Sequence, residues 1–213
     1  MLTTTRQLCD HLRPTTLRDL FQPLSLVQRL ERMVEDKRLV NMLFHGQPGI
    51  GKTSAVRILL KELDAEVLPI NGSFSTGIDT VRDDIARFCS STSLWGRLKV
   101  VSIDECEYLS KNAQAAMRGT IEEYPWAAFI LTANDVSKLD RAIKSRCLEV
   151  CFDVTVFDAP AVIERVLPGY HQKLTTLGCC VPFERLRQIM YLKFPDLRAV
   201  AMMLELEAGL KPT

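Results

Sequence analysis

The sequence lacks any long hydrophobic run, and no stretch approaches the roughly 18 consecutive apolar residues that a membrane-spanning helix needs. Its first ten residues, MLTTTRQLCD, contain no apolar core of the kind found in signal peptides. We therefore expect a cytoplasmic protein, or a nuclear one if the source is eukaryotic, with no membrane partner.

Paired cysteines are also missing. The chain has seven cysteines, an odd number, and none of them forms a CxxC pair. Zinc sites usually show paired Cys or Cys/His modules. We expect reduced and mostly buried thiols, and the pattern does not favour the alternatives, a metal site or a structural disulfide.

Net charge is nearly absent, because 27 Lys and Arg residues stand against 26 Asp and Glu residues and leave a formal charge of +1. No global basic field draws such a chain onto nucleic acid. Any DNA contact has to come from a local patch or from assembly with other subunits. With 47% hydrophobic and 25% charged residues, the composition is that of a globular protein and excludes disorder or coiled coil for the whole chain.

Short apolar runs alternate with amphipathic stretches in the first part of the chain. The apolar runs have the length of buried strands and lie at 39–45, 67–70, 98–103, 127–132 and 148–152. Helical periodicity occurs at 24–38, 52–63, 78–90 and 112–123. Strands alternating with helices form a parallel sheet that is covered on both faces. We predict an α/β domain over residues 1–154 with a five-stranded parallel sheet.

After Pro160 the pattern is helical only. The predicted helices lie at about 158–167, 169–177, 183–192 and 195–208, and they are separated by Pro168, Gly178, Pro182 and Pro195. Residues 155–213 are too few to be stable alone. They are predicted to form a small all-α lid domain that packs on the first domain.

One segment matches a phosphate-binding motif at every position. The pattern GxxxxGK[ST] is filled by Gly46, Gln47, Pro48, Gly49, Ile50, Gly51, Lys52 and Thr53, between a predicted strand and a predicted helix. Its glycines let backbone amides and the helix N-terminus point at phosphate. Lys52 is expected to reach the β- and γ-phosphates and Thr53 to ligate Mg²⁺, with Ser54 beside them. A Gly/Pro turn that spells the motif by chance is the alternative, and the flanking elements argue against it.

An acidic pair, Asp104 and Glu105, follows the third predicted strand. Both residues are expected at the carboxyl edge of the sheet, where ligands of open α/β sheets bind. Asp104 would hold Mg²⁺ through water, and Glu105 would polarise the water that attacks the γ-phosphate. A solvated acidic turn is the alternative, and the upstream phosphate loop makes it the weaker one. The presence of Glu105 predicts that the protein hydrolyses the nucleotide, whereas a passive nucleotide sensor would not need this residue.

Further short motifs occur around these two. They are Leu12-Arg13-Pro14, Asn71-Gly72-Ser73, Leu131-Thr132-Ala133-Asn134, Ser145-Arg146-Cys147 and Phe194-Pro195-Asp196-Leu197-Arg198. In this order and spacing the chain resembles AAA+ ATPases, and in particular the small ATPase subunits of DNA-polymerase clamp loaders. These include the replication factor C small subunits and the corresponding phage proteins. The resemblance covers nearly the whole chain and implies the AAA+ P-loop NTPase fold.

The resemblance implies roles around the nucleotide. Arg13 and Pro14 would lie against the adenine. Asn71 would restrain Glu105 until DNA arrives, and would therefore act as its switch. Asn134, the first sensor residue, would help to position water. Taken singly, Asn134 is an ordinary turn former.

Two arginines complete the implied site. Arg146 would enter the ATP site of the neighbouring subunit, where a positive charge stabilises the transition state. Arg198, the second sensor residue, would reach back from the lid to the γ-phosphate. Taken singly, Arg146 is a surface salt-bridge residue and Arg198 an exposed helix charge.

The resemblance also implies contacts with DNA and with a clamp. Family members line up helix N-termini along duplex phosphates. The matching residues are Gly77, Ile78 and Arg82 in one helix, and Lys111, Gln114 and Arg118 in the next. Gln114 and Arg118 would relay DNA contact to the ATP site, whereas Arg82 has the alternative of pairing with Asp79. Phe88 or Leu94 would face the ring-shaped clamp, or else belong to the core.

The leading hypothesis is therefore an ATP-hydrolysing subunit of a sliding-clamp loader that uses ATP and Mg²⁺. Its implied partners are other AAA+ subunits, in a ring or spiral of about five, primer-template DNA and a sliding clamp. The alternatives are a helicase loader or initiator-like remodeller, and an ATP-dependent scaffold with little turnover. Clamp loader subunits continue past the lid into a helical collar, and we expect this chain to lack one.

Overall fold

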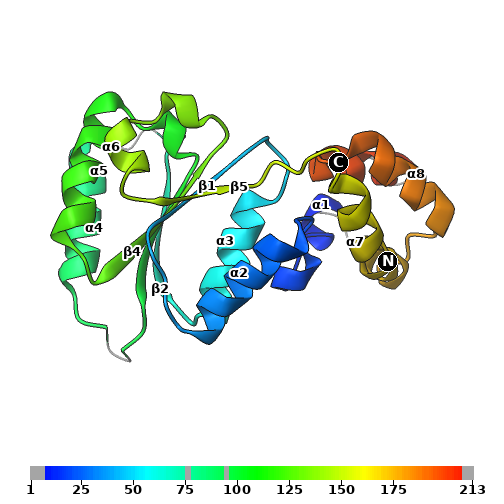
Figure 1. The fold of residues 1–213 in the computed structure, drawn as a ribbon, viewed down its shortest axis with the longest axis horizontal. Helices are drawn as coiled ribbons and strands as arrows, with labels where there is room; N and C mark the ends of the chain where they lie inside the picture. The colour runs from blue at the N-terminus through cyan, green and yellow to red at the C-terminus, as the bar shows by residue number, and fades with distance from the viewer. Residues whose placement is uncertain (1–7, 75–77, 94–95, 208–213) are drawn as a thin grey trace.

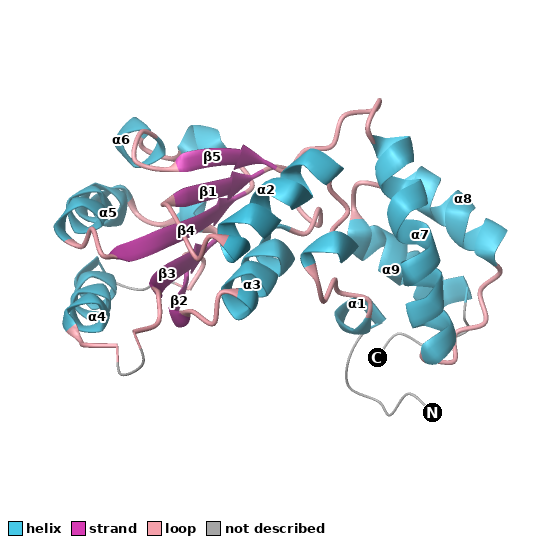
Figure 2. Cartoon of the chain, turned by 60° about the horizontal axis from the view of Figure 1, so that its bottom comes forward, coloured by secondary structure: helices cyan, strands magenta, loops and turns pink. Residues whose placement is uncertain are grey.

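The computed structural model describes residues 8–74, 78–93 and 96–207 of the chain. The chain has two bodies at opposite ends of its long axis (Figure 1). One body holds a sheet between two layers of helices, and the other is helical (Figure 2). Among the described residues, none of the helices combines the length and the hydropathy that a bilayer crossing requires.

The five predicted strands are present and form one parallel sheet. They are β1 (Met42–His45), β2 (Glu66–Asn71), β3 (Lys99–Asp104), β4 (Ala127–Ala133) and β5 (Leu148–Cys151). Their order is β2-β3-β4-β1-β5. β1 lies between β4 and β5, since Met42 pairs with Ile130 on one side and with Leu148 on the other. Because all strands run the same way, the loops after β1, β3 and β4 meet at one edge of the sheet, its carboxyl edge.

Helices cover both faces of this sheet, as predicted. They are α2 (Leu24–Glu35) and α3 (Lys52–Glu62) on one face, and α4 (Ile78–Ser90) and α5 (Lys111–Glu123) on the other (Figure 2). Successive side chains of a strand point to opposite faces of the sheet, so each strand contributes to the two apolar clusters on either side of it. Leu43 packs in the α4–α5 cluster, whereas its neighbours Met42 and Phe44 pack in the α2–α3 cluster.

The lid contains one helix where the sequence predicted two. Its helices in the described residues are α7 (Ala159–Thr176), α8 (Phe183–Lys193) and α9 (Leu197–Glu207). The predicted break at Pro168 is wrong, because α7 runs through this residue. A proline inside a helix removes a backbone donor and costs about 3 kcal/mol. Here Leu167 and Tyr170 on either side of it are buried in the lid core, and their burial keeps the helix continuous.

The start of the described chain packs on the lid. α1 (Leu8–His11) contacts α9, and Leu8, Leu12 and Phe21 belong to the apolar cluster of the lid helices. The guanidinium of Arg165 in α7 donates hydrogen bonds of 2.5, 2.6 and 2.8 Å to the carbonyl oxygens of Arg18, Leu20 and Gln22. The division at residue 154 stays a prediction, and the N-terminal segment shares the core of the lid.

Candidate nucleotide-binding site

The phosphate loop joins the end of β1 to the start of α3. Its three glycines all have positive φ, at 139° for Gly46, 80° for Gly49 and 101° for Gly51. A Cβ on Gly49 would lie 2.4 Å from Oδ1 of Asp196 in the lid, and one on Gly46 would lie 2.7 Å from Oδ1 of Asp153. Glycine is therefore required both for the backbone conformation and for the close approach of the neighbouring carboxylates.

Lys52 is buried under this loop. Its ammonium donates to the carbonyl oxygens of Gly46 and Gln47 at 2.7 and 2.8 Å, and to Oδ1 of Asn134 at 2.8 Å. Burial lowers the pKa of Lys52, and the nearby carboxylate of Glu107 opposes this shift. All three donors of the ammonium are bonded to protein, so a phosphate would replace at least one of these bonds. The predicted pairing of Lys52 with the phosphates fits this position.

Thr53 and Asp104 meet at the carboxyl edge of the sheet. The Thr53 hydroxyl donates to Oδ1 of Asp104 at 3.0 Å, and the Thr132 hydroxyl donates to the same carboxylate. Hard oxygen ligands of this kind suit Mg²⁺, which keeps water and substrate phosphates as its other ligands. The described part of the chain has no cluster of three or more His, Cys, Asp or Glu side chains that would hold a metal alone. Thr53 and Asp104 are the residues of this site that could hold a metal ion.

Glu105 has a left-handed backbone, with φ at 55°. Its N–H donates to Oγ1 of Thr132 at 3.0 Å, and its carboxylate accepts a hydrogen bond from the hydroxyl of Ser73. The side chain of Asn71, the predicted switch, does not hydrogen-bond Glu105 in this structure; its Oδ1 accepts from the Ser73 N–H at 2.8 Å. Gly72 between them is required, since a Cβ there would lie 2.5 Å from the carbonyl oxygen of Glu105.

The backbone of Asn134 is hydrogen-bonded by Glu107, a residue that the sequence analysis did not single out. Its N–H donates to Oε1 of Glu107 at 2.9 Å, and Glu107 is buried in a short 3₁₀ turn, Cys106–Tyr108. Two positions after Glu105, Glu107 continues the acidic segment, and this is the signal that would have found it. Glu107 thus fixes the backbone of Asn134, whose side chain bonds Lys52.

A cavity of about 270 Å³ lies where these residues meet the lid. The predicted residues that line it are Arg13, Pro14, Pro48, Gly49, Gly51, Lys52, Thr53, Ser54, Asp104, Glu105, Asn134 and Arg198. Arg57, Phe21 and Tyr170 also line it and were missed. Arg57 follows Ser54 by about one turn of α3, which the sequence could have indicated. Phe21 and Tyr170 come together only through packing of the N-terminal segment on the lid.

Three residues of the loop motif, Gly46, Gln47 and Ile50, have structural roles and do not line the cavity. The carbonyl of Gly46 accepts from Lys52, the N–H of Gln47 donates to Oδ1 of Asp153 at 2.7 Å, and the side chain of Ile50 is buried in the α2–α3 cluster. Asp153, at the exit of β5, therefore fixes the start of the phosphate loop.

The lid touches the phosphate loop directly. The N–H of Leu197 donates to the carbonyl of Gly49 at 3.2 Å. Asp196 caps α9, because its Oδ1 accepts from the N–H groups of Arg198 and Ala199 at 3.0 and 3.1 Å. This turn brings Arg198 to the cavity, where the sequence placed it.

Arg146 lies away from the cavity. It precedes β5 and so stands at the amino edge of the sheet, whereas the phosphate loop leaves β1 at the carboxyl edge. Its guanidinium forms an ion pair with Glu122 of the same chain. In this conformation Arg146 does not serve the cavity of its own chain.

The predicted DNA-facing residues divide into exposed and buried ones. Arg82 on α4 and Lys111 and Arg118 on α5 are exposed, whereas Gly77 lies outside the described residues and Ile78 is the first residue of α4. Gln114 is only 1% exposed, and its side chain bonds the carbonyl of Leu109 and the N–H of Asp140 at 3.1 and 2.9 Å. The prediction that Gln114 contacts DNA directly is therefore wrong, because its side chain is buried and its polar atoms are hydrogen-bonded inside the protein. Its role as a relay stays a prediction.

Of the two candidate clamp residues, Phe88 packs against the core. It is half-buried in the α4–α5 cluster, and the ammonium of Lys99 lies 5.0 Å from its ring centroid. Leu94 lies outside the described residues.

The glycine loop, the buried lysine and the paired Thr53 and Asp104 define a P-loop nucleotide-binding protein of the α/β class. Residues 42–153 match the family described as "ATPase family associated with various cellular activities (AAA)", and the chain belongs to this family. Membership in this family implies ATP binding.

Curated relatives are similar over most of this chain. The replication factor C small subunit of Methanosphaera stadtmanae is 37% identical over 160 residues, which cover 72% of this chain and 49% of the relative. Replication factor C subunit 5 of Mus musculus is 29% identical over 201 residues, 91% of this chain and 58% of the relative. The chain thus spans about half the length of the curated relatives it matches.

Solved structures share the fold. RuvB of Thermotoga maritima, a Holliday junction branch migration motor, superposes with a TM-score of 0.66 at 20% identity. The match covers 92% of this chain and 64% of that one. The likeness is one of fold, and it confirms the AAA fold predicted from the motifs.

Proposed function

We propose that the chain is an ATP-hydrolysing subunit of a sliding-clamp loader, and that it acts with other AAA+ subunits on primer-template DNA. The replication factor C relatives support this assignment. The observation that carries it is the position of Arg146, at the opposite edge of the sheet from its own cavity. An arginine at this edge cannot reach the ATP of its own chain, and in this proposal it acts on the ATP of a second subunit.

Binding falls to the loop and the lid in this proposal. Lys52 exchanges a protein acceptor for phosphate oxygens, and Arg198 adds a second positive charge from α9. Arg13 and Pro14 form the wall against the base. Mg²⁺ held by Thr53 and Asp104 would neutralise phosphate charge.

Turnover falls to Glu105. Glu105 lines the cavity, and its carboxylate would accept a proton from the attacking water when it is free to turn toward that water. In this structure the carboxylate is engaged by the hydrogen bond from the Ser73 hydroxyl. Asn134 lies beside it and is fixed by Glu107. Hydrolysis therefore waits for release of Glu105.

Arg146 completes the site of the neighbouring subunit. An arginine supplied in trans stabilises the charge of the phosphoryl-transfer transition state and is worth about 10³- to 10⁵-fold in turnover. A single chain carries a formal charge of +1 and should hold DNA weakly. Several copies of Arg82, Lys111 and Arg118 in a row would give a track whose affinity falls steeply with salt.

The test is the steady-state ATPase rate of the wild-type chain with and without primer-template DNA, and then with its clamp. We expect stimulation by both. Glu105→Gln and Arg146→Ala should each lower turnover by at least about 100-fold, and chelation of Mg²⁺ should abolish it. Stimulation by DNA but not by a clamp would favour a helicase loader or another remodeller, and stimulation by neither would favour a scaffold. Unchanged turnover in either variant would overturn the site assignment.

A further inference from the structure

We propose that Glu122 is a positioning residue for Arg146, which sets the orientation in which the guanidinium is presented to the ATP of a neighbouring subunit. The inference rests on the proposed role of Arg146 in trans. Glu122 belongs to none of the motifs of the chain.

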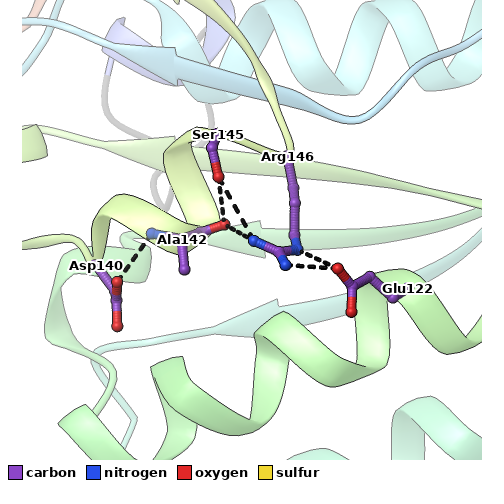
Figure 3. Close-up of polar contacts among 5 residues, drawn as sticks. All are labelled: Glu122, Asp140, Ala142, Ser145 and Arg146. Atoms are coloured by element: carbon purple, nitrogen blue, oxygen red, sulfur yellow. Dashed lines mark hydrogen bonds and ion pairs between the residues drawn. The ribbon is translucent and has the colours of Figure 1, made fainter.

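Two elements hold the guanidinium from two sides (Figure 3). From α5, Oε1 of Glu122 accepts from Nε of Arg146 at 2.9 Å and also contacts Nη2. From α6 (Arg141–Lys144), the carbonyl of Ala142 accepts from Nη1 at 2.7 Å. Nη1 also donates to Oγ of Ser145 at 3.5 Å. Four of the five N–H groups are thus engaged within the chain, and one, on Nη2, remains for an acceptor outside it.

The carbonyl of Ala142, which holds Arg146 from α6, belongs to a turn that is itself held in place. Asp140 caps α6, since its Oδ1 accepts from the N–H of Ala142 at 2.9 Å (Figure 3). The N–H of Asp140 in turn donates to Oε1 of the buried Gln114 at 2.9 Å. The turn whose carbonyl holds Arg146 is therefore tied, through Asp140, to the buried side chain of Gln114 on α5.

Exposure argues that the ion pair acts through orientation and adds little stability. The side chain of Glu122 is 62% exposed and that of Arg146 is 27% exposed. Because the Glu122 carboxylate is largely solvated, the pair contributes little to folding, and removal of Glu122 should leave the chain folded. A long side chain whose guanidinium is already oriented loses less entropy when it meets phosphate, and it needs no reorganisation during reaction.

The activity test mixes two inactive chains. A donor carries Lys52→Ala and keeps Arg146, and a receiver carries Arg146→Ala and keeps its ATP site. Mixing should restore DNA-stimulated turnover, since each active site combines parts of both chains. Glu122→Ala in the donor should lower kcat of the mixture about five-fold with KM for ATP unchanged, and Glu122→Gln, which keeps an acceptor oxygen, about two-fold.

The controls separate positioning from a structural effect. Glu122→Ala in the receiver should change nothing, because its arginine is already gone. Glu62→Gln in the donor, at the exposed end of α3, should also be silent. A mixture that regains no activity would overturn the proposed function together with this inference. Restored activity that donor Glu122→Ala leaves unchanged or raises would overturn only the inference.

A second readout needs no ATP. NMR relaxation of the Arg146 Nε–H group in the isolated chain should give an order parameter near that of rigid backbone, about 0.85, and below about 0.6 in Glu122→Ala. The Arg146 group of Glu62→Gln should match wild type. A group that is mobile in the wild-type chain would overturn the proposal.

Discussion

The hydroxyl of Ser73 donates a hydrogen bond to the carboxylate of Glu105, the predicted general base. Ser73, which lies two positions after the predicted switch Asn71, is therefore the residue that bonds this carboxylate. Asn71 acts one step further back, because its Oδ1 accepts from the Ser73 N–H and shapes the turn that carries the hydroxyl. The restraint on Glu105 is thus divided between two side chains of one motif.

Ser73→Ala should raise the ATPase rate in the absence of DNA about five-fold, since it removes the hydrogen bond that holds Glu105 away from water. DNA should then stimulate the variant less than wild type. Asn71→Ala should have the same direction and a smaller size. Ser25→Ala, on the exposed face of α2, is the matched control. An unchanged DNA-free rate in Ser73→Ala would show that this bond restrains nothing.

Gly49→Ala should weaken ATP binding at least about ten-fold, because φ at this position is positive and the added Cβ would collide with Asp196. Titration with a fluorescent ATP analogue measures the change in Kd. Adding Asp196→Ala should recover only part of the loss, since the backbone strain stays. Gly119→Ala is the control: it lies in α5 with open space around it, so binding should be unchanged and stability should rise by up to about 1 kcal/mol. Equal binding by Gly49→Ala and wild type would contradict the prediction.

Asp19 should make the free energy of unfolding depend on pH in the acidic range. Partial burial opposes its ionisation, but hydrogen bonds from Lys173 and Thr15 outweigh this and lower its pKa to about 2 from an ordinary value of 3.8. Because the pKa is depressed in the folded state, the stabilisation is present above pH 3.8 and is lost as the pH falls toward 2.

Asp19→Asn should therefore lower the free energy of unfolding by about 1 kcal/mol at neutral pH, with a difference that shrinks below about pH 4. Urea unfolding of both proteins across this pH range measures it. Asp83→Asn, at an exposed position of α4, controls for the loss of one carboxylate. A difference that stays constant with pH would mean that the ionisation of Asp19 is not its cause.

Local patterns were enough to predict the sheet and most of the cavity. A buried strand needs only a short apolar run, and the phosphate loop needs only its glycines and Lys52, so both are visible in the sequence. Lys52, Thr53, Asp104 and Asn134 all leave the carboxyl edge of parallel strands, and parallel topology alone brings them together.

The remaining features depend on contacts between distant segments. Pro168 indicates a break only if the side chains around it are exposed, and their burial in the lid core reverses that reading. Phe21 reaches the cavity because Arg165 fixes the backbone beside it, and no periodicity encodes that bond. Ser73 reaches Glu105 through a turn whose direction is set by the close approach of Gly72.

The packing of α1 on α9 has a consequence for synthesis on the ribosome. The N–H of Leu8 bonds the carboxylate of Glu205, across a separation of 197 residues. At roughly 5–20 residues per second, α1 waits on the order of ten seconds or more for its partner. α1 is thus placed only after α9 has been made, and the wall of the cavity that contains Leu12 closes only when translation has delivered α9.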